Sequence, residues 1–378
     1  MAAPSTCPHC HEPVASTDSF CEACGADLAS SAAPAVLTGS GATTPPVAAA
    51  DDAAAHDHAA TGGPRTSQTA RVADPLDPAR NRTCLACGGA VDDDGFCSVC
   101  GQRAPVPRDH WTESPSAWVG GVCDKGIVHA RNEDAMALAS TTDRTRAVLV
   151  VCDGVTSAPD SDRASIAAAR AACRVLTEAP GADSDSFPAR LTHWEQMLGA
   201  ACRDANAEAV GVAHRLGDPI EPPSCTFVAA VVDGDLASVA WCGDSRAYWL
   251  PDAGDGVQLG LDHSVGTWLI ASGMSREEAE RDPGFHTITR WLGADSFDAT
   301  PECVSQRLDA PGWVLVCSDG MWNYASEPAA LHELIETARR DGAADPTVIA
   351  EAMAAWANAQ GGHDNVSVAL ARIDARVP

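Results

Sequence analysis

Apolar runs of strand length, most of them ended by polar turn residues, recur from about residue 118 to residue 373. The most continuous runs predict strands buried on both faces, over residues 147–152, 225–232, 236–242, 246–250, 313–317 and 366–370. Asp233-Gly234 separates two of these runs and predicts a hairpin turn. Apolar residues at helical spacing predict helices over 162–177, 191–216, 331–340 and 346–359. Strands clustered between helices predict an α+β domain in which helices flank stacked sheets.

The first part of the chain has a different pattern, built on cysteine pairs. Four Cys-x-x-Cys pairs occur there, formed by Cys7 and Cys10, Cys21 and Cys24, Cys84 and Cys87, and Cys97 and Cys100. Each pair can place two thiolates on one metal ion, and two neighbouring pairs close a tetrahedral site. The alternatives are a redox dithiol or ordinary buried cysteines, but a redox motif normally occurs once, beside a βαβ unit. We therefore expect two structural Zn²⁺ ions, one in each of two ribbons.

These patterns predict a domain order. A zinc ribbon over residues 1–28 is followed by a flexible Ala/Pro-rich linker over 29–82. A second ribbon over 83–104 and a short linker over 105–117 lead into the main domain, residues 118–375.

Composition and charge narrow the function classes. The 378 residues carry 25 Lys and Arg against 52 Asp and Glu, a formal charge of −27, which disfavours binding to nucleic acid or to an anionic membrane surface. No apolar run reaches the length of a membrane span, and the start lacks the features of a signal peptide. The 16 cysteines are therefore expected as thiols or metal ligands in a soluble cytoplasmic protein.

Acidic residues stand at the ends of several predicted strands. They are Glu133-Asp134, Asp153-Gly154, Asp319-Gly320 and Asp364-Asn365. Any single Asp-Gly would be interpreted as a turn. Carboxylates that converge repel one another unless a cation neutralises them, and oxygen ligands favour Mg²⁺ or Mn²⁺. Because two such ions can bind phosphoryl oxygens and activate a water, the set indicates a phosphoester hydrolase.

The set and its order resemble a known family, the metal-dependent serine/threonine protein phosphatases of type 2C (PPM family). The resemblance covers most of the predicted domain and rests on Asn132-Glu133-Asp134-Ala135, Val150–Gly154, Cys225–Ala230, Gly243–Tyr248, Asp262–Ser264, Ile288–Gly293, Cys317–Met321 and Gly362–Ser367. It implies a four-layer αββα sandwich with a binuclear metal site at one edge. Low Lys usage with heavy Ala and Arg usage is typical of a GC-rich bacterial source.

The resemblance also implies a role for each matching residue. Asp153 would bridge two Mn²⁺ or Mg²⁺ ions, Asp319 and Asp364 would complete the first site, and Glu133 with the Gly154 carbonyl oxygen would hold the second. Asp244 would help to bind a weaker third ion, and Asp134 would orient a water on the metals. That water would attack phosphoserine or phosphothreonine directly, without a covalent phosphoenzyme. The expected substrates are phosphorylated proteins, the targets of Ser/Thr kinases, and residues 264–290 would form a flap over the site.

Two positions depart from the family pattern. The family usually has a phosphate-binding Arg four residues before the Glu of the Asn-Glu-Asp motif, and here that position is His129. Arg131 is the alternative ligand for phosphate, and on a strand it would share the face of His129. The glycine-rich turn that usually follows Asp-Gly is replaced by residues 155–160, so we expect a reshaped phosphate pocket.

Two other interpretations of the function can each be tested by a single feature of the sequence. A Cys-based phosphatase needs a His-Cys-x5-Arg loop, which the chain lacks. A phosphatase-like adaptor without turnover, binding phosphoproteins or partners through the ribbons, would be indicated by lost metal ligands, and all five family positions are retained. His263, His286 and His363 lie near the motifs and are expected as flap or loop residues rather than general acids. The ribbons are expected to recruit a protein partner or to regulate the domain.

Overall fold

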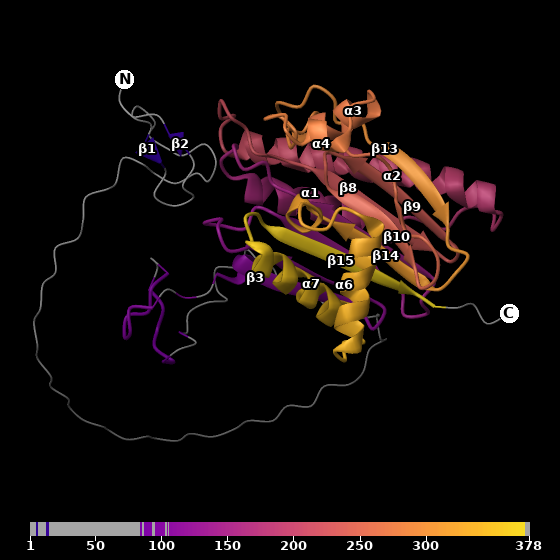
Figure 1. The fold of residues 1–378 in the computed structure, drawn as a ribbon, viewed down its shortest axis with the longest axis horizontal. Coiled ribbons are helices and arrows are strands. Elements are labelled where there is room, and N and C mark those ends of the chain that lie inside the picture. The colour runs from indigo at the N-terminus through magenta and orange to yellow at the C-terminus, as the bar shows by residue number, and fades with distance from the viewer. Residues whose placement is uncertain are drawn as a thin grey trace, which may run out of the picture. The chain divides into compact units, whose positions relative to one another are not determined.

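The computed structural model describes residues 5–6, 13–14, 84, 87–92, 95–102, 104 and 106–374 (Figure 1). The chain divides into two compact units, Met1–Thr69 and Ala70–Pro378. In the first unit, strands β1 (Ser5–Thr6) and β2 (Pro13–Val14) form an antiparallel pair. The predicted linker 29–82 and the cysteines Cys7, Cys10, Cys21 and Cys24 lie outside the described residues.

Two antiparallel sheets form the centre of the main domain. The five-stranded sheet has the order β13 (Glu302–Arg307), β9 (Leu236–Cys242), β8 (Phe227–Asp233), β6 (Arg146–Cys152) and β5 (Ala135–Ser140). The six-stranded sheet has the order β11 (Val257–Gln258), β10 (Arg246–Pro251), β14 (Gly312–Cys317), β15 (Val366–Ile373), β4 (Val119–Asp124) and β3 (His110–Ser116). A small pair joins β7 (Ser224–Cys225) to β12 (Leu292–Gly293).

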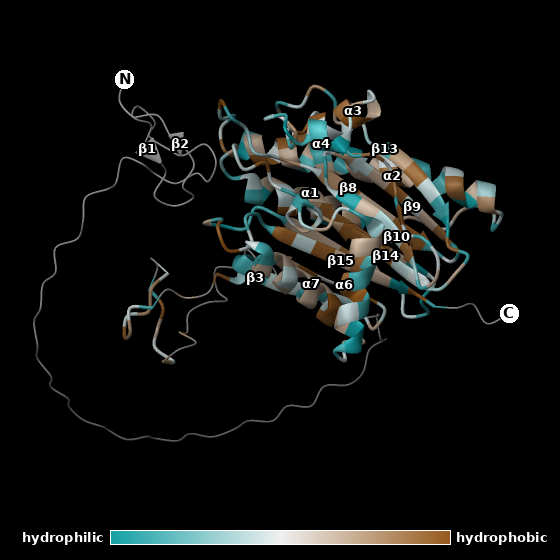
Figure 2. Ribbon diagram, in the orientation of Figure 1, coloured by the Kyte–Doolittle hydropathy of each residue, from teal (hydrophilic) through white to brown (hydrophobic). Residues whose placement is uncertain are grey.

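Alternation along each central strand explains the continuous apolar runs. On β6, Val148 and Val150 face the core beneath the helices, whereas Leu149 and Val151 face the core between the two sheets. Both faces of the strand are therefore buried, so polar residues are excluded from either side. Figure 2 shows the hydrophobic colouring concentrated along these central strands.

Helices cover the outer face of each sheet (Figure 1). Helices α1 (Ser161–Glu178) and α2 (Phe187–Arg215) pack on the five-stranded sheet through side chains such as Leu176, Trp194 and Leu198. Helices α5 (Asp319–Trp322), α6 (Pro328–Arg340) and α7 (Pro346–Gln360) pack on the six-stranded sheet, around Trp313 and Ile335. The predicted four-layer αββα sandwich, an α+β fold, is confirmed. No helix in the described part of the chain has the length and apolar character needed to cross a membrane.

The N-terminal boundary of the domain differs from the prediction. Segment 105–117 was expected as a linker, but it contains the 3-10 helix η2 (Pro107–Asp109) and the edge strand β3. Trp111 and Glu113 are buried while their neighbours along β3 are exposed, so only one face of this edge strand meets the core. A half-buried strand that contains Pro115 lacks the apolar run that identified the central strands.

Segment 264–290 carries two short helices, α3 (Val265–Ala271) and α4 (Arg276–Ala279). The Ser264 hydroxyl accepts from the backbone N–H of Thr267 and caps α3. Ser275 and Glu278 form a reciprocal capping box at α4. Local capping therefore supports this segment, which presents the exposed side chain of Trp268.

Candidate functional site

The strand register brings acidic residues to one edge of the sandwich. Ala135 at the start of β5 pairs with Cys152 at the end of β6, so Asp134 and Asp153 leave the five-stranded sheet side by side. In the six-stranded sheet, the end of β14 lies beside the start of β15, which places Asp319 and Asp364 at one end of that pair. Asp244 lies where the chain passes from β9 in one sheet to β10 in the other.

These five carboxyl groups lie close enough to shift one another's pKa values. Burial raises the pKa of Asp153 well above its usual range, and the neighbouring carboxylates of four other residues raise it further: Asp134, Asp319, Asp364 and Asp244. Burial, followed by repulsion from Asp364 and Asp244, likewise raises the pKa of Asp319. Burial also raises the pKa of Asp244 to about 7. A group of this kind is stable in its ionised form only when a cation compensates it.

Asp134 is held through one oxygen only. Its Oδ2 accepts hydrogen bonds from the hydroxyls of Ser318 at 2.7 Å and Ser367 at 2.8 Å. Its Oδ1 is buried and has no hydrogen-bond partner among the described residues. An unpartnered carboxylate oxygen inside an acidic cluster fits a site completed by a ligand.

Glu133 lies beside the cluster with its carboxylate already contacted. Its Oε1 accepts from Arg131 Nε at 2.9 Å, from Arg131 Nη2 at 2.6 Å and from the Ser161 hydroxyl at 2.8 Å. Gly154 lies against the same residue, because a Cβ at Gly154 would stand 2.6 Å from the Glu133 carbonyl oxygen. Glycine is therefore required where the turn after β6 passes the Asn-Glu-Asp loop.

His129 and Arg131 reach different carboxylates. Residues 125–134 form a loop rather than a strand, so the two side chains do not share a face. The His129 Nε2 atom lies 3.4 Å from Asp364 Oδ1. The Arg131 guanidinium contacts Glu133 while the side chain stays 53% exposed. Of the two, Arg131 is the more open to an incoming anion.

Several polar residues that position the acids were not among the predicted site residues. The Asn365 side chain accepts from the Glu133 backbone N–H at 2.7 Å and donates to the carbonyl oxygens of Lys125 and Arg131, so it holds the whole loop. Asn365, Ser318 and Ser367 stand inside the quoted motifs, and that position was the available signal. Ser161, at the start of α1, had no such signal.

The three histidines near the motifs have structural contacts. His263 accepts from the Gly243 backbone N–H at 3.1 Å, and His286 stacks on Trp322 with ring centres 6.3 Å apart. His363 is exposed, and its backbone N–H donates to the Tyr324 hydroxyl at 3.1 Å. These contacts agree with the expected flap and loop positions.

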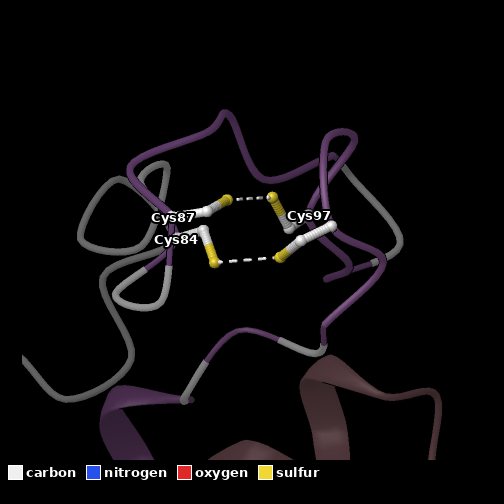
Figure 3. Close-up of side chains that lie close together, drawn as sticks. Cys84, Cys87 and Cys97 are labelled. Atoms are coloured by element: carbon white, nitrogen blue, oxygen red, sulfur yellow. Dashed lines mark hydrogen bonds between the residues drawn. The ribbon is translucent and has the colours of Figure 1, made fainter. Parts of the chain in front are cut away.

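The second cysteine cluster is a compact four-thiol group. The ligand atoms of Cys84, Cys87, Cys97 and Cys100 all lie within 4.8 Å of one another. Figure 3 shows the labelled sulfurs turned toward a common centre, with Sγ separations of 3.4 Å for Cys87 to Cys97 and 3.6 Å for Cys84 to Cys100. Four thiols in this arrangement fit one tetrahedral Zn²⁺ ion.

The backbone of this cluster supports metal binding. Each Cys-x-x-Cys pair is followed by a glycine with positive φ, Gly88 at 73° and Gly101 at 71°, as a tight knuckle requires. The backbone N–H groups of Cys100 and Val99 lower the pKa of the Cys97 thiol to about 6. At Cys87 the Gly89 backbone N–H lowers the pKa, but the neighbouring thiols of Cys100 and Cys97 outweigh it and raise the pKa to about 12. Proximity of the four sulfurs therefore favours the thiolate at Cys97 first.

Comparison with protein-family models gives two matches. Residues 127–356 match the model described as protein phosphatase 2C. Residues 6–28 match a zinc-ribbon domain. No curated protein matches the chain.

Solved structures with the same fold include several phosphatases. The Mycobacterium tuberculosis serine/threonine phosphatase PstP/Ppp is 25% identical with a TM-score of 0.55, covering 68% of this chain and 98% of its own. Stp1 from Staphylococcus aureus is 23% identical with a TM-score of 0.56, covering 68% and 95%. The PstP catalytic domain in complex with two manganese ions is 24% identical with a TM-score of 0.53, covering 70% and 100%. Because the family model spans more than half of the sequence, this chain belongs to the protein phosphatase 2C family of phosphoprotein phosphatases.

Proposed function

We propose that the main domain hydrolyses phosphoserine and phosphothreonine in proteins, using two divalent cations held by the acidic cluster. The observation that carries the proposal is the environment of Asp153, whose carboxyl group lies among four other carboxylates. Asp134 and Asp244 are buried and the other three are partly exposed, and such a group of acids destabilises a fold unless it binds cations, so the arrangement indicates a function.

The donor set fits hard divalent cations. The candidate ligands are all oxygens: Asp153 would be shared by both ions, Asp319 and Asp364 would hold the first, Glu133 and the Gly154 carbonyl would hold the second, and Asp244 would help to hold a third. Mn²⁺ is the ion named for one related structure, and Mg²⁺ has the same oxygen preference.

The cations, when bound, supply an activated water and neutralise charge on the phosphoryl oxygens. The protein's own part is orientation. Ser318 and Ser367 fix Asp134 through Oδ2, which leaves Oδ1 to accept a hydrogen bond from the attacking water. The water oxygen bonds to phosphorus and the bond from phosphorus to the serine or threonine oxygen breaks. Of the two water hydrogens, one stays on the phosphate and the equivalent of the other protonates the leaving oxygen, which departs as the alcohol.

Arg131 is the proposed phosphate ligand in place of the family arginine. Nε and Nη2 of Arg131 donate to Glu133, and the remaining guanidinium N–H donors are available because the side chain is half exposed. A guanidinium can bind two phosphate oxygens at once, whereas a neutral imidazole donates a single hydrogen bond. His129 Nε2 lies 3.4 Å from Asp364 Oδ1, so the imidazole stands beside a candidate cation ligand.

The direct test is hydrolysis of a phosphothreonine peptide and of p-nitrophenyl phosphate by the full chain with Mn²⁺, with Mg²⁺ and with EDTA. We expect turnover with either metal and none with EDTA. Metal binding without turnover would instead support a phosphoprotein-binding adaptor. One observation favours this alternative, because Arg131 and Ser161 already donate hydrogen bonds to the Glu133 carboxylate.

The zinc ribbons are proposed as recruitment or regulatory modules. With four thiolates around one ion no ligand position stays open, so each site stabilises its ribbon rather than performing chemistry. Partner binding through these modules is expected to change which phosphoproteins reach the domain.

A further inference from the structure

Arg108 is a buried arginine directly before the first strand of the domain. It belongs to η2, and only 5% of the residue is exposed. Its guanidinium donates to the carbonyl oxygens of Asn132 at 3.0 Å, Asp134 at 2.7 Å and Asp162 at 2.9 Å, and to the Ser165 hydroxyl at 3.1 Å. One side chain therefore contacts both ends of the Asn-Glu-Asp motif and the first turn of α1.

The Asn-Glu-Asp motif and Ser165 make further hydrogen bonds that reinforce the Arg108 contacts. The Asn132 side chain donates to the Arg108 carbonyl oxygen at 3.0 Å, and the Ser165 hydroxyl donates to the Glu133 carbonyl oxygen at 2.5 Å. Three consecutive carbonyl oxygens, those of residues 132, 133 and 134, are thus bonded by Arg108 or by its partner Ser165. These residues precede β5, so strand pairing does not satisfy them, and the side chains do so instead.

Burial of the Arg108 guanidinium costs free energy, and its hydrogen bonds require the shape of an arginine side chain. All the hydrogen-bond acceptors given above are neutral oxygens, and burial lowers the pKa of Arg108, although nearby acids such as Asp162 and Asp134 oppose that shift. Burying a charge without a directly bonded carboxylate costs free energy. An arginine that is kept at such a position is therefore expected to have a role. The planar fork of arginine can bond several acceptors in fixed directions, which a lysine or glutamine cannot reproduce.

We propose that Arg108 is a positioning residue that sets the backbone of Glu133 and Asp134, and with it the geometry of the cation site. The inference rests on the proposed function of that site. It also ties the site to the segment that leaves the second ribbon. The Ala104 N–H donates to the Gly95 carbonyl oxygen of the ribbon at 2.8 Å, and η2 begins soon afterwards, at Pro107. The ribbon and the helix that contains Arg108 are therefore nearly adjacent along the chain.

The test compares Arg108→Gln and Arg108→Lys with a matched control, Arg190→Gln, in the full chain. Arg190 is also largely buried and donates to a carbonyl oxygen, that of Asp233 at 2.7 Å. Because Arg146 pairs with Asp233 while Val151 pairs with Val228, this contact lies at the end of the sheet opposite Asp153. Calorimetric titration with Mn²⁺ gives a readout that does not depend on turnover, and kcat, KM and Tm are measured alongside.

We expect Arg108→Gln to weaken Mn²⁺ binding about tenfold or more and to lower kcat, with KM for p-nitrophenyl phosphate changing less than twofold. Arg108→Lys keeps the charge and should fall between this variant and the wild type. Arg190→Gln should lower Tm while leaving Mn²⁺ affinity and kcat unchanged.

Wild-type Mn²⁺ affinity in both Arg108 variants would overturn the positioning role, and so would an equal loss in Arg190→Gln, since the effect would then be general destabilisation. If Arg108→Gln does not fold, the lysine variant decides on the same criteria. A wild type that binds Mn²⁺ but has no turnover would contradict the proposed function, while the titration would still test Arg108.

Discussion

At the scale of single residues, the site depends on which side-chain atoms are bonded and which stay open. Asp134 receives two hydroxyl donors on one oxygen and has no partner on the other among the described residues. Arg131 donates to Glu133 and still faces solvent. The acids could be predicted from their positions at strand ends. Among the donors that orient them, Ser318 and Ser367 had only their place inside the motifs as a signal. Ser161 and Arg108 had none, because a hydroxyl or a guanidinium leaves no periodic pattern in the sequence.

Arg131→Gln should raise KM for a phosphothreonine peptide about tenfold, because a charge-assisted, bidentate contact to phosphate is lost. His129→Arg should change KM less than twofold if Arg131 already fills the role of the family arginine. Steady-state kinetics with saturating Mn²⁺ measure both. A large gain in affinity in His129→Arg, with no loss in Arg131→Gln, would show that the missing guanidinium limits phosphate binding.

Glu113 provides a pH-dependent test of stability away from the site. Burial raises its pKa from 4.5 to about 7, while the Leu138 N–H and the charge of Arg170 act in the opposite direction. The folded state then holds a proton that the unfolded state releases above pH 4.5, so the Glu113 contribution to stability falls as the pH rises from about 4.5 through about 7.

At pH 8, Glu113→Gln should therefore increase the free energy of unfolding by up to about 3 kcal/mol and raise Tm accordingly. At pH 5 the substitution should have little effect on either quantity. Glutamine can still accept from the Leu138 N–H, which Glu113 Oε2 accepts at 2.7 Å. Thermal unfolding of both proteins across this pH range is the measurement. Equal Tm values at pH 8 would contradict a raised pKa for Glu113.

At the scale of elements, prediction succeeded where both faces of a strand are buried. Strands β6, β9 and β14 are continuous apolar runs, and their boundaries match the sequence closely. Strand β4 contains Gly120 and Gly121, where a Cβ would stand 2.2 Å from Thr347 Oγ1 and 2.5 Å from Met136 Sδ. Close packing requires glycine there, and glycine in a strand resembles a loop in the sequence. Strand β3 was missed because one of its faces is exposed.

The boundary at β3 predicts how the domain can be shortened. A chain beginning at residue 106 retains Arg108 and the edge strand, and it should unfold cooperatively. One beginning at residue 118 loses both, exposes β4 at the sheet edge and frees the Asn-Glu-Asp loop, so it should aggregate or unfold at a much lower temperature. Circular dichroism melting compares the two. Equal stability would mean that residues 106–117 are a linker after all.

At the scale of the whole molecule, two chemistries are separated along the chain. The candidate thiol ligands occur in pairs in the N-terminal region, whereas the candidate oxygen ligands lie at one edge of the sandwich. The remaining cysteines are dispersed, mostly as buried strand or helix residues. Under the proposed function, this separation would keep zinc and the hard divalent cations at different sites, because each prefers its own type of ligand.

Metal analysis of the purified full chain should find two zinc ions per chain. Replacing Cys84 and Cys97 by Ser should lower this to one, since both belong to the described cluster. Cys303→Ser is the matched control, an exposed cysteine on β13 outside any ribbon, and it should leave the zinc content unchanged. Retention of two zinc ions in the double variant would contradict a four-thiolate site at Cys84–Cys100.

Mn²⁺ binding and turnover, measured in parallel in three proteins, test whether the acidic cluster holds catalytic divalent cations. Wild type should bind at least two Mn²⁺ ions and hydrolyse the phosphothreonine peptide. Asp153→Asn should stay folded, lose Mn²⁺ binding and lose turnover at least a thousandfold, as expected when a metal-bridging ligand is removed. Asp143→Asn, which removes an exposed carboxylate in the turn between β5 and β6, at the end of the sheet opposite the cluster, should behave as wild type in both assays. Near wild-type turnover in Asp153→Asn would contradict the assignment of the site.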